Sequence, residues 1–137
     1  MSDSLEQLPE SQVHARIGDE GFARLCNAFF AMVRTDDLLG PLYEAAVAAT
    51  GETLLDAERK LCAFLIFRFG GPDAYVQERG HPRLRARHMR FPVDGRGAGR
   101  WLELMERAMV QAALDEQVCA ALRPYLRETA KFMMNRA

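Results

Sequence analysis

Apolar side chains recur at helical spacing along most of the chain. One clear stripe runs from Phe22 to Val33, and it follows Gly18 and Asp19, which are typical of a helix start. Alternating runs rich in valine or threonine are almost absent, and no Asn-Gly hairpin signal occurs. The pattern therefore predicts an all-α fold.

The next segments contain capping signals. The run Thr35–Asp37 offers caps for a short helical segment through Tyr43, and we interpret Asp36 and Asp37 as caps and not as an acid pair. Residues 45–51 are small and are expected to form a connection that is only partly helical. Thr53, followed three residues later by Asp56, predicts a capping box that opens another helix.

Glycine and proline break the middle of the chain. The Gly-Gly-Pro run at 70–72 is expected to end the preceding helix. The segment 72–91 is punctuated, and Pro82 indicates the start of a short helix because proline suits the first helical turn. Gly95, Gly97 and Gly99 predict a loose loop.

Two further helices are predicted near the carboxyl end. A stripe from Trp101 to Ala112 has helical spacing. Asp115 is expected to cap a final helix that reaches Met133, and Pro124 should kink or divide that helix.

Length and charge narrow the class of protein. A chain of 137 residues fits one domain, expected to span 1–137 with a polar N-terminal extension over about 1–17. With 49% hydrophobic and 27% charged residues the chain is globular, and a net charge of −1 gives no electrostatic case for nucleic acid or an anionic membrane. No apolar run could span a bilayer, and the polar start carries no export signal. We expect a cytoplasmic protein.

The three cysteines are scattered along the chain. Cys26, Cys62 and Cys119 show no paired spacing. This pattern favours reduced core thiols over a zinc or iron–sulfur site.

Three histidines are candidates for metal ligation. His14 lies in a polar setting and is expected to be solvated, whereas His81 and His88 are seven residues apart and on one helix would share the same face. That spacing separates them by about 10 Å along the axis, so both cannot reach one metal. His81 precedes Pro82 and is placed for local hydrogen bonding. The residues alone leave His88, beside Leu84, as either a packing residue or a ligand.

Polar groups near these histidines admit two interpretations. The arginines form a solvated basic face or a clamp for carboxylates or phosphates. Trp101, the only tryptophan, is a core residue or a site residue, and its N–H needs a partner if buried, as do the hydroxyls of Tyr43 and Tyr75. The arginines are Arg79, Arg83, Arg85, Arg87 and Arg90.

One stretch resembles a known family. Its residues are Phe69-Gly70-Gly71-Pro72, Tyr75, Gly80-His81-Pro82, Leu84-Arg85, Arg87-His88, Phe91-Pro92 and Trp101-Leu102. This run looks like a group II truncated haemoglobin, and the likeness extends over roughly residues 21–136. The resemblance implies a shortened globin in which two helices pack over two around haem b.

The resemblance also implies roles for particular residues. His88 would be the proximal ligand of the haem iron, with Arg87 and Tyr75 near the propionates. The remaining implied haem contacts are Leu84, Arg85, Phe91, Leu61, Phe64 and Phe69. The implied distal ligand pocket consists of Phe29, Phe30, Tyr43, Ala57 and Trp101.

Two features depart from the family pattern. Phe30 stands where the family usually has a tyrosine, whose hydroxyl holds the bound ligand, so tight oxygen binding is not implied here. The segment from Tyr43 to Ala57 is longer than usual and suggests an extra turn or a flap near the distal pocket.

The resulting functional hypothesis is a haem protein that binds a diatomic gas (oxygen, carbon monoxide or nitric oxide), with oxygen binding or transport as the family default. The first alternative is a redox enzyme that acts on peroxide or nitric oxide, served by a reductase, with Trp101 and Tyr43 shaping its pocket. The second is a haem-free interaction or sensor module. The protein is expected to be a monomer or homodimer.

Overall fold

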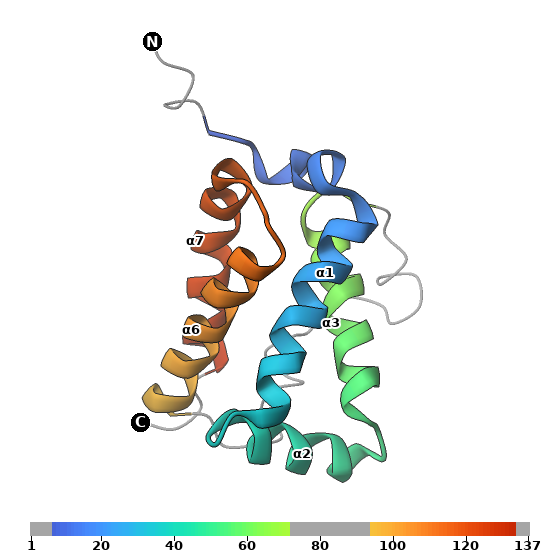
Figure 1. Ribbon diagram of the computed structural model, residues 1–137, viewed down its shortest axis with the longest axis vertical. Helices are drawn as coiled ribbons and strands as arrows, with labels where there is room; N and C mark the ends of the chain where they lie inside the picture. The colour runs from blue at the N-terminus through green and yellow to red at the C-terminus, as the bar shows by residue number, and fades with distance from the viewer. Residues whose placement is uncertain (1–6, 72–93, 134–137) are drawn as a thin grey trace.

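The computed structural model describes residues 7–71 and 94–133 of the chain, and each element in them is helical (Figure 1). This confirms the predicted all-α class. The elements are the 3-10 helix η2 (Glu10–Gln12) and the α-helices α1 (Val13–Thr35), α2 (Leu39–Thr50), α3 (Leu54–Arg68), α6 (Gly95–Gln111) and α7 (Glu116–Met133).

The four longest helices form two pairs. Helix α1 lies beside α3, α6 lies beside α7, and α1 also packs against α6, which joins the pairs (Figure 1). The short helix α2 runs across one end of the molecule and contacts α1, α3 and α6. This arrangement is the two-over-two sandwich that the resemblance implied.

Helix α1 begins earlier than the sequence predicted. It starts at Val13, and Gly18, with a φ of 70°, kinks it where a start was expected. Glycine adopts this positive-φ conformation without a steric penalty, so a short helical segment precedes the main one. The buried face of α1 consists of Val13, Gly21, Phe22, Leu25, Cys26, Phe29, Phe30 and Val33.

The predicted limits of α3 are confirmed. The N–H of Asp56 donates to Thr53 Oγ1 at 3.1 Å, and the N–H of Thr53 donates to Asp56 Oδ2 at 3.0 Å, which completes the capping box. The helix ends at Arg68, and Gly70 follows with a φ of 100°. A Cβ at Gly70 would lie 2.0 Å from the carbonyl oxygen of Ser11, so this close approach of the N-terminal segment requires glycine.

Two predicted connections are helical instead. Residues 45–50 belong to α2, which ends on Gly51 in the left-handed conformation. The three glycines of 95–99 lie in the first turns of α6, where Asp94 Oδ1 accepts a hydrogen bond from the N–H of Gly97 at 3.0 Å. This cap and the burial of Gly97 and Ala98 offset the low helix propensity of glycine, which costs about 1 kcal/mol per residue.

The last helix starts as predicted. Asp115 Oδ1 accepts from the N–H of Val118 at 3.0 Å. Helix α7 continues through Pro124, so this proline does not divide it. Cys26 and Cys119 are buried free thiols, as expected, whereas Cys62 is only partly buried. Among the described helices, none is long and apolar enough to cross a membrane.

Candidate functional site

Four aromatic side chains from three helices form one buried cluster. Phe29 and Phe30 come from α1, Tyr43 from α2 and Trp101 from α6, and their exposed fractions are 0%, 1%, 7% and 3%. The ring of Phe29 lies edge-on to the rings of Trp101 (5.8 Å between centroids) and Tyr43 (6.4 Å). Phe30 is edge-on to Tyr43 at 5.5 Å. The structure thus brings together four of the five residues predicted for the distal pocket.

A hydrogen bond joins the two polar members of this cluster. Trp101 Nε1 donates to Tyr43 Oη at 3.1 Å, and the bond is buried. Burial raises the pKa of the Tyr43 hydroxyl, and the hydrogen bond from Trp101 offsets only part of that effect. Tyr43 is therefore a neutral hydroxyl at physiological pH and keeps its proton as a donor.

Helix α3 contributes a separate apolar face. Ala57, Leu61 and Phe64 are spaced at i, i+4 and i+7 and so share one side of the helix. Ala57 and Leu61 are half-buried, whereas Phe64 is buried and its ring lies 6.2 Å from that of Tyr125. The predicted fifth distal residue, Ala57, therefore lies on the same face as two predicted haem contacts.

Phe69 belongs to a second aromatic cluster, beyond the end of α3. It is fully buried, and its ring lies 5.5 Å from Tyr125 and 6.3 Å from Phe22. The guanidinium of Arg68 covers the Tyr125 ring at 4.6 Å. Phe69 is thus a core residue that joins α1, α3 and α7.

Six predicted site residues lie outside the described residues. They are His88, Arg87, Tyr75, Leu84, Arg85 and Phe91. Within residues 7–71 and 94–133, no group of three or more His, Cys, Asp or Glu side chains could hold a metal ion. His14 was expected to be solvated, but it is half-buried. Its ring stacks with the ring of Phe22 at a centroid distance of 6.2 Å, and its Nε2 lies 2.6 Å from Asp19 Oδ1.

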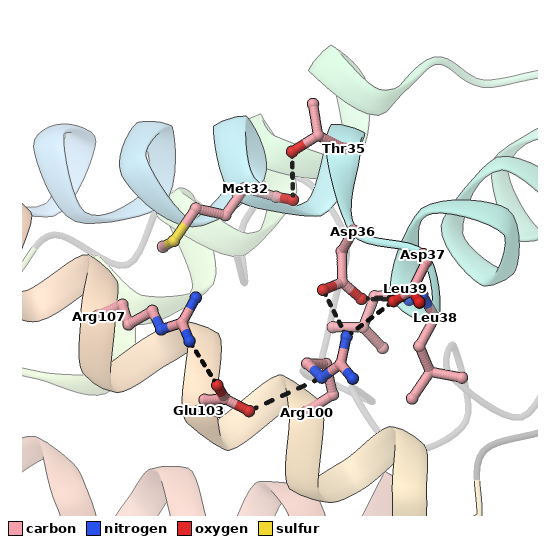
Figure 2. Close-up of polar contacts among 9 residues, drawn as sticks. All are labelled: Met32, Thr35, Asp36, Asp37, Leu38, Leu39, Arg100, Glu103 and Arg107. Atoms are coloured by element: carbon pink, nitrogen blue, oxygen red, sulfur yellow. Dashed lines mark hydrogen bonds and ion pairs between the residues drawn. The ribbon is translucent and has the colours of Figure 1, made fainter.

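The sequence did not predict an ion pair next to the aromatic cluster. Arg100, which precedes Trp101, places Nη1 2.7 Å from Asp36 Oδ1 (Figure 2). Asp36 also caps α2 as predicted, because its Oδ2 accepts from the N–H groups of Leu38 (3.0 Å) and Leu39 (2.8 Å). Asp36 and Asp37 before a short helix were visible in the sequence. Arg100, which pairs with Asp36, lies 64 residues away and could not be predicted from it.

Comparison with known proteins identifies the family. The family model for bacterial-like globins matches residues 12–135. A group 2 truncated haemoglobin of Bacillus subtilis is 35% identical over 119 residues, which cover 87% of this chain and 85% of the relative. The chain belongs to the group II truncated haemoglobins. A two-on-two haemoglobin of Arabidopsis thaliana is 30% identical over 128 residues, covering 93% of this chain and 71% of the relative.

Solved truncated haemoglobins share the fold. The truncated oxygen-avid haemoglobin from Bacillus subtilis superposes with a TM-score of 0.80 at 34% identity, covering 90% of this chain and 98% of that one. The haemoglobin of the thermophilic phototrophic bacterium Chloroflexus aurantiacus gives 0.81 at 36% identity, with the same coverage of 90% and 98%. Membership of this family implies a haem-binding globin that takes a diatomic ligand.

The described residues of this truncated haemoglobin fit a haem. Eight of its predicted site residues are described, and their only side-chain polar atoms are Trp101 Nε1 and Tyr43 Oη. Apolar side chains suit the porphyrin faces, and a single buried donor pair suits a small polar ligand. A different cavity of about 290 Å³ lies between α6 and α7, and it contains none of these residues.

Proposed function

We propose that this truncated haemoglobin binds haem b through His88 and holds a diatomic gas, foremost oxygen, beside Tyr43 and Trp101. The buried hydrogen bond between these two residues, inside an otherwise apolar cluster, carries the proposal. When bound, haem supplies the iron that coordinates both the histidine and the gas. The oxygen-avid character stated for the Bacillus subtilis neighbour supports oxygen as the ligand.

The chain would hold the haem by two kinds of contact. Arg87, Arg85 and Tyr75 would bind the propionates, because guanidinium groups pair with carboxylates in bidentate fashion. Apolar side chains would cover the ring faces, since burial of apolar surface drives cofactor binding. These side chains are Leu84, Phe91, Leu61 and Phe64, whereas Phe69 packs against Phe22 and Tyr125.

Trp101 and Tyr43 would act on the gas as an ordered pair. A hydroxyl has one donor hydrogen and can accept other hydrogen bonds. Because Tyr43 Oη accepts from Trp101 Nε1, the hydrogen of Tyr43 is the one that this pair can direct to a ligand. Donation from Trp101 also polarises the Tyr43 O–H and strengthens it as a donor, an effect that burial enhances. Trp101 thereby orients Tyr43, and Tyr43 contacts the ligand.

A redox enzyme acting on peroxide or nitric oxide is the second candidate, and Phe30 favours it. The Phe30 ring is 1% exposed and lies edge-on to Tyr43, where it offers no hydrogen-bond donor. A pocket with fewer donors releases oxygen faster, so stable oxygen carriage would suffer. Turnover with peroxide or nitric oxide distinguishes this activity from carriage.

The absorption spectrum of the purified full-length protein tests the proposed function. We expect haem bands in the ferric protein, bands typical of histidine ligation after reduction, and a shifted Soret band with carbon monoxide. A protein that carries no haem and takes none up when haem is added would contradict the proposal and favour an interaction or sensor module.

A further inference from the structure

Two contacts tie α6 to the region of α2, and they involve adjacent residues of α6. Arg100 reaches Asp36 with an Nη1–Oδ1 distance of 2.7 Å, and Trp101 reaches Tyr43 with an Nε1–Oη distance of 3.1 Å. The first contact is part-buried and the second is buried. Because neighbouring side chains on a helix point about 100° apart, Arg100 can face the α1–α2 turn while Trp101 faces the core.

Asp36 is fixed on several sides. Its side chain is only 11% exposed, and one carboxylate oxygen accepts the N–H groups of Leu38 and Leu39 while the other accepts Arg100 (Figure 2). Burial alone would raise the pKa of Asp36, but hydrogen bonds from the Leu39 N–H and Arg100 outweigh burial and hold the pKa below its ordinary value. The ionised carboxylate is therefore the native form, and it links α6 to the first turn of α2.

The start of α2 is also held against the end of α1. The N–H of Gly40 donates to the carbonyl of Asp36 at 3.0 Å, and a Cβ at Gly40 would lie 3.1 Å from the carbonyl oxygen of Val33. Tyr43 follows Leu39 by four residues, which is about one helical turn. Tyr43 therefore lies about one helical turn beyond the turn that Asp36 caps.

Arg100 has two other acidic neighbours, and both are weaker candidates for this role. Asp37 Oδ1 lies 3.1 Å from Arg100 Nη1, but its side chain is 91% exposed. Glu103 Oε1 lies 3.7 Å from Arg100 Nε and also pairs with Arg107 on the same helix, so it does not reach α2 (Figure 2). Exposed pairs of this kind contribute little because solvent screens them.

We propose that Arg100 is a positioning residue, whose ion pair with Asp36 sets the placement of α6 against α2 at which Trp101 donates to Tyr43. A shift of about half an ångström would take a 3.1 Å bond outside its normal range, so this placement is critical. The effect of Arg100 on ligand release rests on the proposed function. Its effect on the placement of Trp101 against Tyr43 can be measured independently.

The single tryptophan makes the measurement direct. In a 15N–1H correlation spectrum of the full-length protein, the chain gives one indole N–H signal, that of Trp101. Its exchange with solvent is slow while the N–H is buried and hydrogen-bonded. The protein is studied as purified, in the reduced carbon monoxide form if it carries haem.

The variants separate the ion pair from the cap. Arg100→Gln removes the charge, and Asp36→Asn keeps an oxygen that can cap α2 but loses the carboxylate. We expect each to speed indole exchange about fivefold, the ratio for a loss of about 1 kcal/mol, and Arg100→Lys to restore part of the protection. The control Arg107→Gln removes the same charge from the same helix and should leave exchange unchanged.

Folding of each variant is checked by far-UV circular dichroism. Unchanged exchange in folded Arg100→Gln and Asp36→Asn would overturn the proposal, as would equal acceleration in Arg107→Gln. If Arg100→Gln does not fold, the result for Asp36→Asn decides. Oxygen release should speed up in Arg100→Gln, but the Arg100→Gln/Trp101→Phe double variant should release oxygen no faster than Trp101→Phe alone. Absence of haem would refute the proposed function, whereas indole exchange would still test the role of Arg100.

Discussion

The indole N–H of Trp101 donates to the hydroxyl oxygen of Tyr43 over 3.1 Å, and the ring of Phe29 lies edge-on to both side chains. The direction of this bond matters for function. It gives Trp101 a defined partner within the protein and makes Tyr43 the residue that can pass a hydrogen bond on to a ligand. The two residues should therefore act in series and not as independent donors.

A double-mutant cycle on oxygen release tests this order. A hydrogen bond to a ligand with partial charge contributes about 1.5–3 kcal/mol, so Tyr43→Phe should speed oxygen release roughly 10- to 100-fold. Trp101→Phe should also speed release strongly, by removing the donor that orients Tyr43. In the double variant the effects should not multiply. Multiplied effects in stopped-flow measurements would show that Trp101 contacts the ligand itself. Carbon monoxide, which is less polar, should be affected less.

Phe30→Tyr should slow oxygen release. The substitution adds a hydroxyl next to Tyr43, at a ring centroid distance of 5.5 Å from it in the present structure. One additional donor to the ligand is expected to slow release by roughly tenfold or more. Phe30→Leu is the matched control, since it changes the side chain without adding a donor. An unchanged or faster release in Phe30→Tyr would argue against a ligand site beside Phe30.

Tyr43 should ionise late in an alkaline titration. Its folded pKa is raised by burial, so the unfolded chain loses this proton first and stability falls as pH rises above the ordinary tyrosine pKa of about 10. Below that pH the contribution is fully present. Tyr43 should give a late rise in tyrosinate absorbance that coincides with unfolding, and Tyr43→Phe should lack it. Persistence of the late rise in Tyr43→Phe would refute the assignment.

Arg87 should matter more for haem retention than its neighbours. It adjoins His88 in the sequence, and the family resemblance implies that it reaches a propionate, whereas Arg83 and Arg90 are expected to be solvated. A partly exposed charge pair contributes up to about 1 kcal/mol, so Arg87→Ala should lose haem about fivefold faster but still bind it. The rate of haem transfer to an excess of another apoglobin measures this loss. Equal rates in Arg83→Ala, Arg87→Ala and Arg90→Ala would remove the distinction.

Local capping chemistry could be predicted from the sequence. The Thr53–Asp56 capping box and the Asp115 cap involve residues a few positions apart, and both occur as expected. The helical first turns of α6 were not predicted, because glycine is a poor helix former in isolation. These turns are helical because Gly97 and Ala98 pack in the core and Asp94 caps the helix. That packing depends on distant parts of the chain.

Contacts between distant residues could not be predicted from spacing. The residues of the distal cluster were predicted from family resemblance, but the direction of the hydrogen bond between Trp101 and Tyr43, 58 residues apart, needed the structure. The same holds for Arg100 and Asp36. Asp36 was correctly interpreted as a cap, but a capping carboxylate has a second oxygen, and only the fold shows which cation uses it.

The most direct test of the central claim is the reduced absorption spectrum of His88→Gly, recorded with and without added imidazole. His88 would hold the haem iron, so removal of its side chain should abolish the spectrum of histidine ligation, and imidazole bound in the vacated space should restore it. His81→Ala should leave the spectrum unaltered. An unchanged histidine-ligated spectrum in His88→Gly without imidazole would contradict the account.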